Sequence, residues 1–532
     1  MSTRHPIPTV SDGYRKRTQN GFGGYDHRLG SKDGTIFDMK NMCGDFYPLA
    51  STRRERVVSQ ELGPQYRPRE VVAVDDVYTH IGVYLYKGAT DNVTEQLGII
   101  GTGKQSIAVM GSRIIAMPSK RFYDTATGEI GSLEAEWTGA AEFANGTYKG
   151  EEADGCRINA KDGTAFPFNA GDAVTITGAA DEKNNTTIII REISEDKTSL
   201  GFYENSFTVA ESQTLTISRT VPDMDFICEN ENRLWGCKGD NIYASKLGDP
   251  FNFNVFDGIA SDSFSVDTGS AGDFTACVSY GGYVIFFKED KIFKVYGDKP
   301  SNFQAMASAS LGVMKGSDRS LAVAGEALYY LSRTGIMVYT GGIPTNISLP
   351  FGNVRYCDAV GGSDGVRYYV SMKDMDSGEW SLFCYDTRYR EWWREDNVEA
   401  LDFCYFDGLR MLTEKALYRI GSYSNAEDGE TAEGDFDSMV EFFDITESSP
   451  DKKYVSKVQL RLMLSEGAAV KVSMSFDDEP YREVKTLGAD GNHSYYLPCV
   501  LHRCDYYRIR IEGTGKWKLC SLTREYSPGS EA

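Results

Sequence analysis

The stretch GEALYYLSRTGIMVYTGG, from Gly325 to Gly342, decides the fold, because it combines a turn, an aromatic strand, a second turn and another strand. Four further stretches follow the same order. They are NRLWGCKGDNIYAS from Asn232, GGYVIFFKEDKIFKVYG from Gly281, DGVRYYVSMKDMDSGEWSLFCYDTRYREWW from Asp364 and DGLRMLTEKALYRIG from Asp407. Their first turns lie about 40 to 50 residues apart, which is typical of a four-stranded propeller blade.

Two earlier stretches extend the series, namely VVAVDDVYTHIGVYLYKG from Val71 and SIAVMGSRIIAMPSKRFYD from Ser106. The repeats therefore predict six or seven blades. Stacking small sheets in a ring buries both of their faces, whereas an open row exposes its end blades. An N-terminal strand from Ile36 to Val58 is expected to complete the last blade. The alternative is a set of β-sandwiches with coincidental spacing.

The predicted fold class is all-β: a six- or seven-bladed β-propeller with an inserted small β-barrel and a C-terminal β-sandwich. Period-two alternation and polar turns predict both extra modules. The expected division is as follows: an N-terminal arm and propeller-closing strand in 1–69, blades in 70–132, the inserted barrel in 133–221, further blades in 222–423, an acidic linker in 424–438 and the sandwich in 439–532.

The composition is that of a globular protein with a strong acidic excess. Hydrophobic residues make up 41% and charged residues 25% of the 532 positions, and the formal net charge is −21. This charge argues against binding nucleic acid through the overall field. The sequence has no apolar run long enough to span a bilayer and no secretory signal. We therefore expect synthesis in a cytoplasm, no membrane insertion, and eleven Cys in the reduced state.

Catalytic motifs were sought with little result. The chain has no phosphate-binding GxxxxGK[ST] loop, no HExxH and no GxSxG, and none of its five His stands at metal-ligand spacing from another. Asp374, Asp376 and Glu379 would suit Ca²⁺, although a polar hairpin tip is the better explanation for them. The expectation is a protein that is not an enzyme and that has no cofactor, no metal and no catalytic residue.

Three stretches resemble phage tail hub and nozzle proteins of the packaged-DNA stabilisation type. The first is FDMKNMCGDFYPLASTRRER from Phe37, in which Asn41, Pro48, Leu49 and Arg53 match an N-terminal signature. The others are NRLWGCKGDNIYASKLGDPFNFNVF from Asn232 and YDTRYREWWRED from Tyr385. The resemblance covers Ile36 to Gly421.

The resemblance implies a structural virion protein that forms a ring, commonly of six copies, and continues the head-to-tail channel. Its partners would be further copies, other tail and adaptor proteins, and DNA that passes without specific binding. The residues expected to matter for assembly are Asn41, Pro48, Leu49, Arg53, Gly248, Asp249, Pro250, Asn252 and Phe253. Two alternatives remain: a tail-associated carbohydrate-active propeller, and a receptor-binding or baseplate adhesin.

Overall fold

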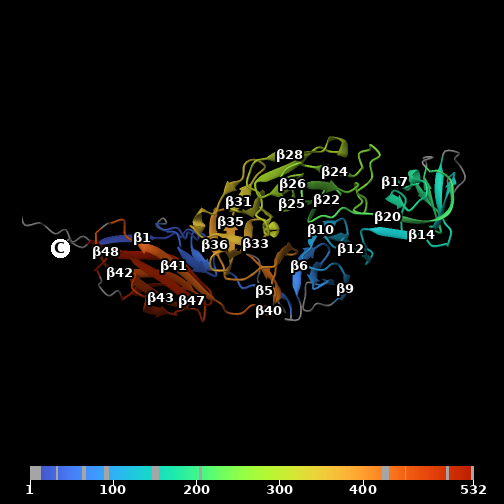
Figure 1. The fold of residues 1–532 in the computed structure, drawn as a ribbon. Helices are drawn as coiled ribbons and strands as arrows, with labels where there is room; N and C mark the ends of the chain where they lie inside the picture. Colours follow the sequence, from blue (N-terminus) through green and yellow to red (C-terminus); the bar gives the residue numbers. More distant parts are fainter. Residues whose placement is uncertain are drawn as a thin grey trace, which may run out of the picture. The chain divides into compact units, whose positions relative to one another are not determined.

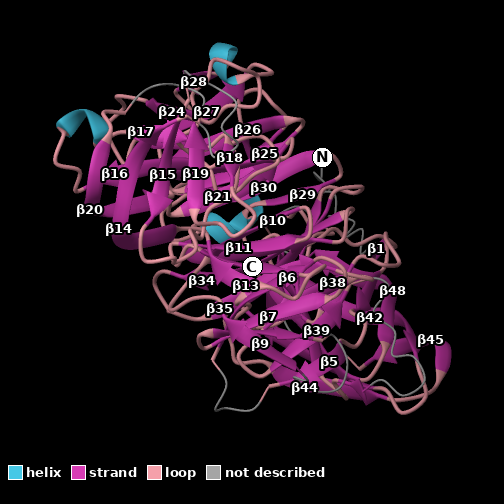
Figure 2. Ribbon diagram, turned by 90° about the vertical axis from the view of Figure 1, so that its right-hand side faces the viewer, coloured by secondary structure: helices cyan, strands magenta, loops and turns pink. Residues whose placement is uncertain are grey.

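A computed structural model describes most of the chain, and strands provide nearly all of its regular structure (Figure 2). It describes residues 14–30, 34–62, 67–88, 95–146, 155–202, 207–421, 431–449, 451–498 and 503–528. The helical segments within these ranges are four short 3₁₀ turns: η1 (Glu182–Asn184), η2 (Pro300–Asn302), η3 (Asp318–Ser320) and η4 (Leu349–Phe351). Among these same residues, no helix has the length and apolarity needed to cross a bilayer.

The chain divides into two compact units, and seven of its sheets have strands in the order expected for propeller blades (Figure 1). Four blades belong to the unit formed by Leu62–Asp318. They are β6 (Pro68–Ala73), β7 (Val77–Ile81), β8 (Tyr84–Lys87) and β9 (Glu95–Ile99); β10 (Ser106–Met110), β11 (Arg113–Met117), β12 (Arg121–Asp124) and β13 (Ile130–Ser132); β21 (Phe226–Asn230), β22 (Arg233–Lys238), β23 (Asn241–Ala244) and β24 (Phe264–Asp267); and β25 (Ala276–Tyr280), β26 (Tyr283–Lys288), β27 (Lys291–Tyr296) and β28 (Gln304–Ser308).

The other unit, Met1–Glu61 with Arg319–Ala532, contains three blades. They are β29 (Ala322–Ala324), β30 (Ala327–Ser332), β31 (Gly335–Tyr339) and β32 (Thr345–Asn346); β33 (Tyr356–Ser363), β34 (Arg367–Asp374), β35 (Trp380–Asp386) and β36 (Glu391–Arg394); and β37 (Asp402–Tyr405), β38 (Leu409–Leu412) and β39 (Ala416–Ile420), joined by β5 (Val57–Glu61) and β40 (Thr431–Ala432). Strand β5 pairs with β39, so an N-terminal strand does complete the last blade. It begins at Val57, and most of the expected donor stretch before it lies elsewhere.

The first turns of the repeats explain why their spacing in the sequence predicted propeller blades. Asn232, Gly282, Gly325 and Gly408 all have positive φ, at 57°, 78°, 51° and 108°. Glycine adopts this region without steric cost, and Asn does so more readily than most residues. The recurring turn residues therefore mark the hairpin between the first two strands in four of the blades, and the seven blade sheets confirm the predicted fold class.

The inserted module is one seven-stranded sheet that curls around its own apolar core. Its strands are β14 (Ala135–Asn145), β15 (Cys156–Ala160), β16 (Ala173–Thr177), β17 (Thr187–Ile189), β18 (Glu192–Ile193), β19 (Ser199–Phe202) and β20 (Ala210–Arg219). The two end strands, β17 and β18, are not paired with each other in the described part of the chain, so the module is a half-open barrel. Large side chains such as Phe143, Phe168 and Phe202 fill its interior.

The C-terminal β-sandwich has two antiparallel sheets, and the N-terminal segment contributes strands to both. One sheet contains β3 (Met42–Cys43), β4 (Ala50–Thr52), β48 (Trp517–Pro528), β42 (Lys453–Leu464) and β45 (Gly491–Leu497), with β1 (Arg15–Gln19) and β46 (Arg503–Cys504) at its side. The other contains β2 (Asp38–Lys40), β41 (Asp437–Ile445), β47 (Tyr507–Thr514), β43 (Ala469–Phe476) and β44 (Arg482–Leu487). The predicted alternation holds, because Val458, Leu460 and Leu462 are fully buried. The expected acidic linker lies outside the described residues from position 424 to 430, and strands β40 and β41 take up part of its remainder.

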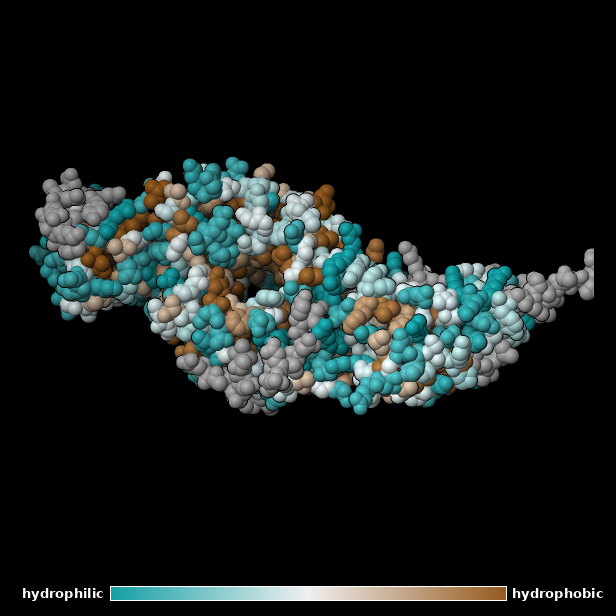
Figure 3. Space-filling view, turned by 180° about the vertical axis from the view of Figure 1, so that it is seen from behind, coloured by the Kyte–Doolittle hydropathy of each residue, from teal (hydrophilic) through white to brown (hydrophobic). Residues whose placement is uncertain are grey.

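The surface is mixed in character. In Figure 3, hydrophobic residues interrupt a largely hydrophilic face at several places. Of the eleven cysteines, ten lie in the described part and all ten are free, five of them buried.

Candidate functional site

Asn41 and Arg53, two residues of the N-terminal signature, lie together in a buried network. Asn41 follows β2 with a positive φ of 55°, and its side chain is hidden from solvent. Arg53 Nε donates to Asn41 Oδ1 at 2.7 Å, and the Arg53 amide donates to the Asn41 carbonyl at 3.0 Å. Asn41 Nδ2 donates to the carbonyl of Asp437 at 2.8 Å. The pair therefore fixes the N-terminal segment to the start of β41.

Pro48 and Leu49 have a different role, since they form the turn between β3 and β4. The peptide bond from Tyr47 to Pro48 is cis. The carbonyl of Pro48 accepts a hydrogen bond from the Phe22 amide at 2.8 Å, and the Leu49 amide donates to Phe46 at 2.9 Å. Pro48 is exposed and Leu49 is half-buried, so this turn shapes the N-terminal segment without joining the network of Asn41.

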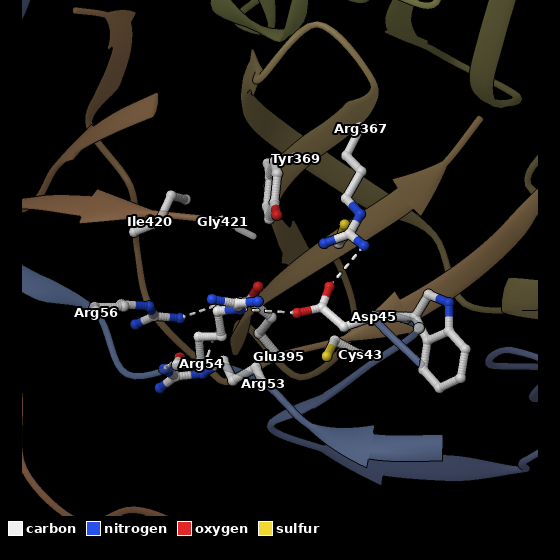
Figure 4. Close-up of a pocket in the computed structure, with 13 residues that line it drawn as sticks. Cys43, Asp45, Arg53, Arg54, Arg56, Arg367, Tyr369, Glu395, Ile420 and Gly421 are labelled. Carbon is white, nitrogen blue, oxygen red and sulfur yellow. Dashed lines mark hydrogen bonds and ion pairs between the residues drawn. The ribbon is translucent and has the colours of Figure 1, made fainter. Parts of the chain in front are cut away.

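We call the five residues Arg53, Arg56, Glu395, Asp396 and Glu433 the arginine cluster (Figure 4 shows three of them). Arg56 pairs with Glu395 and with Asp396, both at 2.8 Å, and Arg53 pairs with Glu433 at 2.5 Å. Both arginine side chains are about 95% buried, with relative exposures of 5% and 6%. The cluster links the N-terminal segment to the end of β36 and to the residue after β40.

A second group of ion pairs adjoins this cluster. Arg367 Nη2 lies 2.7 Å from Asp45 Oδ1, a contact that Figure 4 marks, and Arg367 Nε lies 3.0 Å from Asp386 Oδ2. Arg54 Nε lies 3.2 Å from the other oxygen of Asp45. Because Asp45 lies in the turn between β3 and β4, these pairs attach that turn to the blade of β34 and β35.

The cavity between these groups is small. Residues of both groups line it, together with Tyr369, Cys384 and Trp393, and its volume is about 20 Å³. Such a volume holds about one water molecule. The site therefore has no room for a sugar or a nucleotide, and its construction is that of a joint between segments.

The thiols beside the cavity are poor nucleophiles. Burial, helped by the charge of Asp45, raises the pKa of Cys43 to about 12. Burial likewise raises the pKa of Cys384. Only the thiolate is strongly nucleophilic, so both side chains are inert at neutral pH.

Two carboxylates of the site, unlike the thiols, have a lowered pKa. Burial alone would raise the pKa of Asp396, but the guanidinium groups of Arg56 and Arg53 and the Val398 amide together outweigh burial and hold this pKa below its ordinary value. The same balance, with Arg367 as the main cation, lowers the pKa of Asp45. A carboxylate with a lowered pKa contributes stability that is complete above its unfolded pKa of about 3.9 and is lost as the pH falls through the folded pKa.

We therefore expect the urea midpoint of unfolding to fall as the pH is lowered from about 5 to about 2. The variant Asp396→Asn should show a smaller fall over the same range, because one of the carboxylates responsible is gone. Urea titrations followed by circular dichroism at each pH measure both. The exposed-hairpin variant Asp376→Asn serves as the control and should follow the wild type. Identical pH dependence of Asp396→Asn and wild type would contradict this assignment.

The second set of expected assembly residues, Gly248 to Phe253, forms a loop after β23. Asn252 is 1% exposed, and its Nδ2 donates to Asp249 at 2.7 Å and to Asp172 at 2.9 Å. Its Oδ1 accepts from the amide of Ala173 at 3.0 Å. Asp172 also pairs with Arg219 at 2.6 Å. The loop is therefore hydrogen-bonded to the inserted half-barrel where β16 begins, beside the end of β20. We call this contact the clasp.

The remaining loop residues support this clasp. Gly248 has a φ of 76°, and its amide donates to the carbonyl of Asn232 at 2.7 Å. Pro250 is buried, and Phe253 belongs to an apolar core that also contains Leu133 and Val221, the residues that flank the inserted module. The loop thus connects one blade with both ends of the insertion.

Replacing Asn252 with alanine should lower the free energy of unfolding of this unit by about 1–3 kcal/mol, because buried partners lose their hydrogen bonds. Hydrogen exchange at the Ala173 amide should accelerate, since that amide loses its acceptor. The half-buried Asn254 provides the control, and Asn254→Ala should change stability by less than about 0.5 kcal/mol. Unchanged protection of Ala173 in Asn252→Ala would contradict the clasp.

The candidate calcium ligands form a hairpin tip. Asp374 accepts hydrogen bonds from the amide of Asp376 at 2.8 Å and from the hydroxyl of Ser377 at 2.9 Å. The described residues contain no group of three or more His, Cys, Asp or Glu side chains suited to a metal ion.

Sequence reasoning located part of the site only. It named Asn41 and Arg53, which belong to the N-terminal signature. It did not select Arg56, Glu395 or Asp396, although YDTRYREWWRED contains both acids. The signal that was available is the charged Arg-Glu-Asp end of this stretch, directly after two tryptophans that are buried.

Comparisons with known proteins returned only distant structural likenesses. No protein-family model and no curated protein matches the chain. An exo-β-1,3-galactanase from Phanerochaete chrysosporium has a TM-score of 0.21 and 9% identity, over 56% of this chain and 94% of the galactanase. A glycoside hydrolase family 43 arabinoxylan arabinofuranohydrolase from Bacillus subtilis has a TM-score of 0.17 and 8% identity, over 90% and 96% of the chains. The sialidase of Trypanosoma rangeli has a TM-score of 0.23 and 8% identity, over 96% of both chains.

These neighbours are enzymes, and they overturn the expectation that this chain is not an enzyme, which we withdraw. Their TM-scores are too low to transfer an activity or a substrate to this chain. The assignment of function therefore depends on the chain's own residues.

Proposed function

We propose that the protein is a structural component of a bacteriophage tail, a hub or nozzle whose copies form a ring around the head-to-tail channel. The observation that carries the proposal is the arginine cluster. Two stretches that resemble tail hub proteins, one from Phe37 and one from Tyr385, meet in it through Arg53, Glu395 and Asp396. Residues that are far apart in the sequence thus form one buried joint.

A joint of this kind suits a protein that carries mechanical load. Breaking a buried ion pair by losing one partner costs several kcal/mol. Pulling the N-terminal segment away from the late blade or from the residue after β40 would break several such pairs at once. Other tail and adaptor proteins, and further copies of the chain, are the partners we propose. The virion is the proposed location.

The charge of the chain fits passage of DNA without binding. A net charge of −21 repels phosphate, and specific or non-specific DNA binding normally depends on lysine and arginine contacts that release counterions. In the proposed ring, the protein retains the packaged DNA and conducts it through the channel during ejection without sequence recognition.

Protein identification by mass spectrometry in purified virions tests this proposal. The chain should be present in intact particles and in isolated tails at a constant ratio to the tail proteins. A lysate of infected cells from which virions have been removed is the control. Presence in that lysate together with absence from particles would overturn the proposal.

The second candidate is a carbohydrate-active propeller. An aromatic pocket between two blades, lined by Trp235, Tyr283 and Phe303, favours this candidate because it offers ring faces beside polar groups. Incubation of the full chain with a panel of bacterial surface polysaccharides, followed by chromatography of released sugars, tests for turnover. Sugar release would support the second candidate, and no release from the panel would remove it.

A further inference from the structure

We propose that the pocket between the blades β21–β24 and β25–β28 binds one neutral monosaccharide unit. This deepens the second candidate and rests on its premise that the propeller recognises carbohydrate, but it concerns binding and requires no turnover. Equivalent turns of the two neighbouring blades form one side of the pocket: Asn230 and Glu231 come from the first, and Gly282 and Tyr283 from the second. The blade repeat itself therefore builds the concavity.

The size of the pocket points to a single ring. Its volume is about 130 Å³. Sites for drug-sized ligands usually measure about 300–1,000 Å³. The pocket is thus too small for an oligosaccharide, although it is well above the space of one water.

The wall of the pocket contains a buried donor that lacks an acceptor. Trp235 is 2% exposed, and its indole N–H makes no hydrogen bond to any residue in the described ranges. The ring is held by Phe303 at a centroid distance of 5.1 Å and an angle of 61°. A buried polar group without a partner is costly. The indole nitrogen is shielded from solvent, so a ligand hydroxyl that displaces its cover and accepts this N–H would gain a hydrogen bond that the protein alone does not make.

The rim supplies an aromatic face and acceptors. Tyr283 is 38% exposed, and the Lys294 ammonium lies 3.6 Å from its ring centroid, which fixes the ring. Glu231 and Asp298 add carboxylate oxygens. Aromatic carbon faces pack against the C–H face of a sugar, while carboxylates accept its hydroxyl hydrogens, so the combination fits a polyhydroxylated ring.

The charges of the pocket favour a neutral sugar. The buried guanidinium of Arg233 is occupied by three carbonyl oxygens, those of Ser245 at 2.8 Å, Asp262 at 2.5 Å and Ala260 at 2.6 Å. It therefore holds the neighbouring loop and has no pair of N–H groups left to bind a carboxylate. On the rim, the two carboxylates of Glu231 and Asp298 outnumber the one ammonium of Lys294, so the net negative charge would repel an anionic sugar.

Saturation-transfer NMR with the full chain tests the proposal, using methyl glycosides of galactose, glucose and N-acetylglucosamine as neutral probes and glucuronic acid as the anionic probe. We expect saturable millimolar binding of at least one neutral probe and none of glucuronic acid. Tyr283→Ala should weaken that binding at least about tenfold, and Trp235→Phe, which keeps a ring and removes the N–H, about threefold or more.

The control is Tyr389→Ala, because Tyr389 has a matching exposure of 39% and lies on another blade; it should bind like the wild type. Trp235→Phe guards against misfolding, since it preserves most of the packing. If none of the three neutral probes binds saturably, or if Tyr283→Ala binds as tightly as the wild type, the proposal is overturned. Binding without sugar release would uphold it while removing turnover, so the two failures are distinguishable.

Discussion

The variant Arg56→Met is expected to lose about 3–5 kcal/mol of unfolding free energy in its unit, the usual cost of removing one partner of a buried ion pair. Arg56 contacts Glu395 and Asp396, both at 2.8 Å. Methionine has a similar length and fills much of the space, so the loss comes from the buried Glu395 and half-buried Asp396 carboxylates, which keep only longer contacts of 3.7 Å to Arg53. Urea denaturation followed by tryptophan fluorescence measures it, because Trp392 and Trp393 lie in the adjoining strand.

The matched control is Arg482→Met. Arg482 pairs with Glu479 at the same kind of distance, 2.9 Å, but its side chain is 75% exposed. Surface ion pairs contribute less than about 1 kcal/mol. If Arg56→Met were no more destabilising than Arg482→Met, the arginine cluster would not be the joint that we describe.

The variant Glu70→Ala is expected to cost a similar amount, about 3–5 kcal/mol, in the other unit. Glu70 is 2% exposed, and its carboxylate contacts Nδ1 of the fully buried His80 and accepts from the Gln105 amide at 3.0 Å. The other ring nitrogen of His80 faces the carbonyl of Gly101 at 3.2 Å. The imidazole thus has an acceptor on each side, and removing the Glu70 carboxylate leaves a buried ring nitrogen and the Gln105 amide without this partner.

Thermal unfolding of the full chain, monitored by circular dichroism, compares this variant with Glu129→Ala. Glu129 is an exposed residue in the neighbouring blade, and its replacement should change stability by less than about 0.5 kcal/mol. Equal stability of the two variants would show that the Glu70–His80 pair is not a structural element of its blade.

The blades could be predicted from the sequence because each one is local. A hairpin turn that requires positive φ selects glycine or asparagine, and the aromatic strand that follows it is buried in the same blade. Tyr329 and Tyr330, for example, are both buried within β30. The regular recurrence of these two features was therefore enough to predict both the fold class and its approximate blade number.

The role of the N-terminal segment could not be predicted in this way. Strand β4 pairs with β48, which joins Ala50 to Leu519, and β2 pairs with β41, which joins Lys40 to Met439. Pairings across hundreds of residues leave no periodic trace. Short strands of two or three residues also carry too little alternation to be recognised.

The candidate site illustrates the same limit. Arg53 and Arg56 were noticeable as a basic run, but their partners Glu395, Asp396 and Glu433 are acids in an acid-rich chain. Only the fold shows which acids are buried beside a cation. The pocket of Trp235 and Tyr283 was equally hidden, because it forms between two repeats that each look complete alone.

Single-particle electron microscopy of the purified full chain tests the central claim most directly. The account predicts closed rings of several copies around an open centre. Particles that remain single chains at every protein concentration, also in the presence of isolated tail proteins, would contradict it.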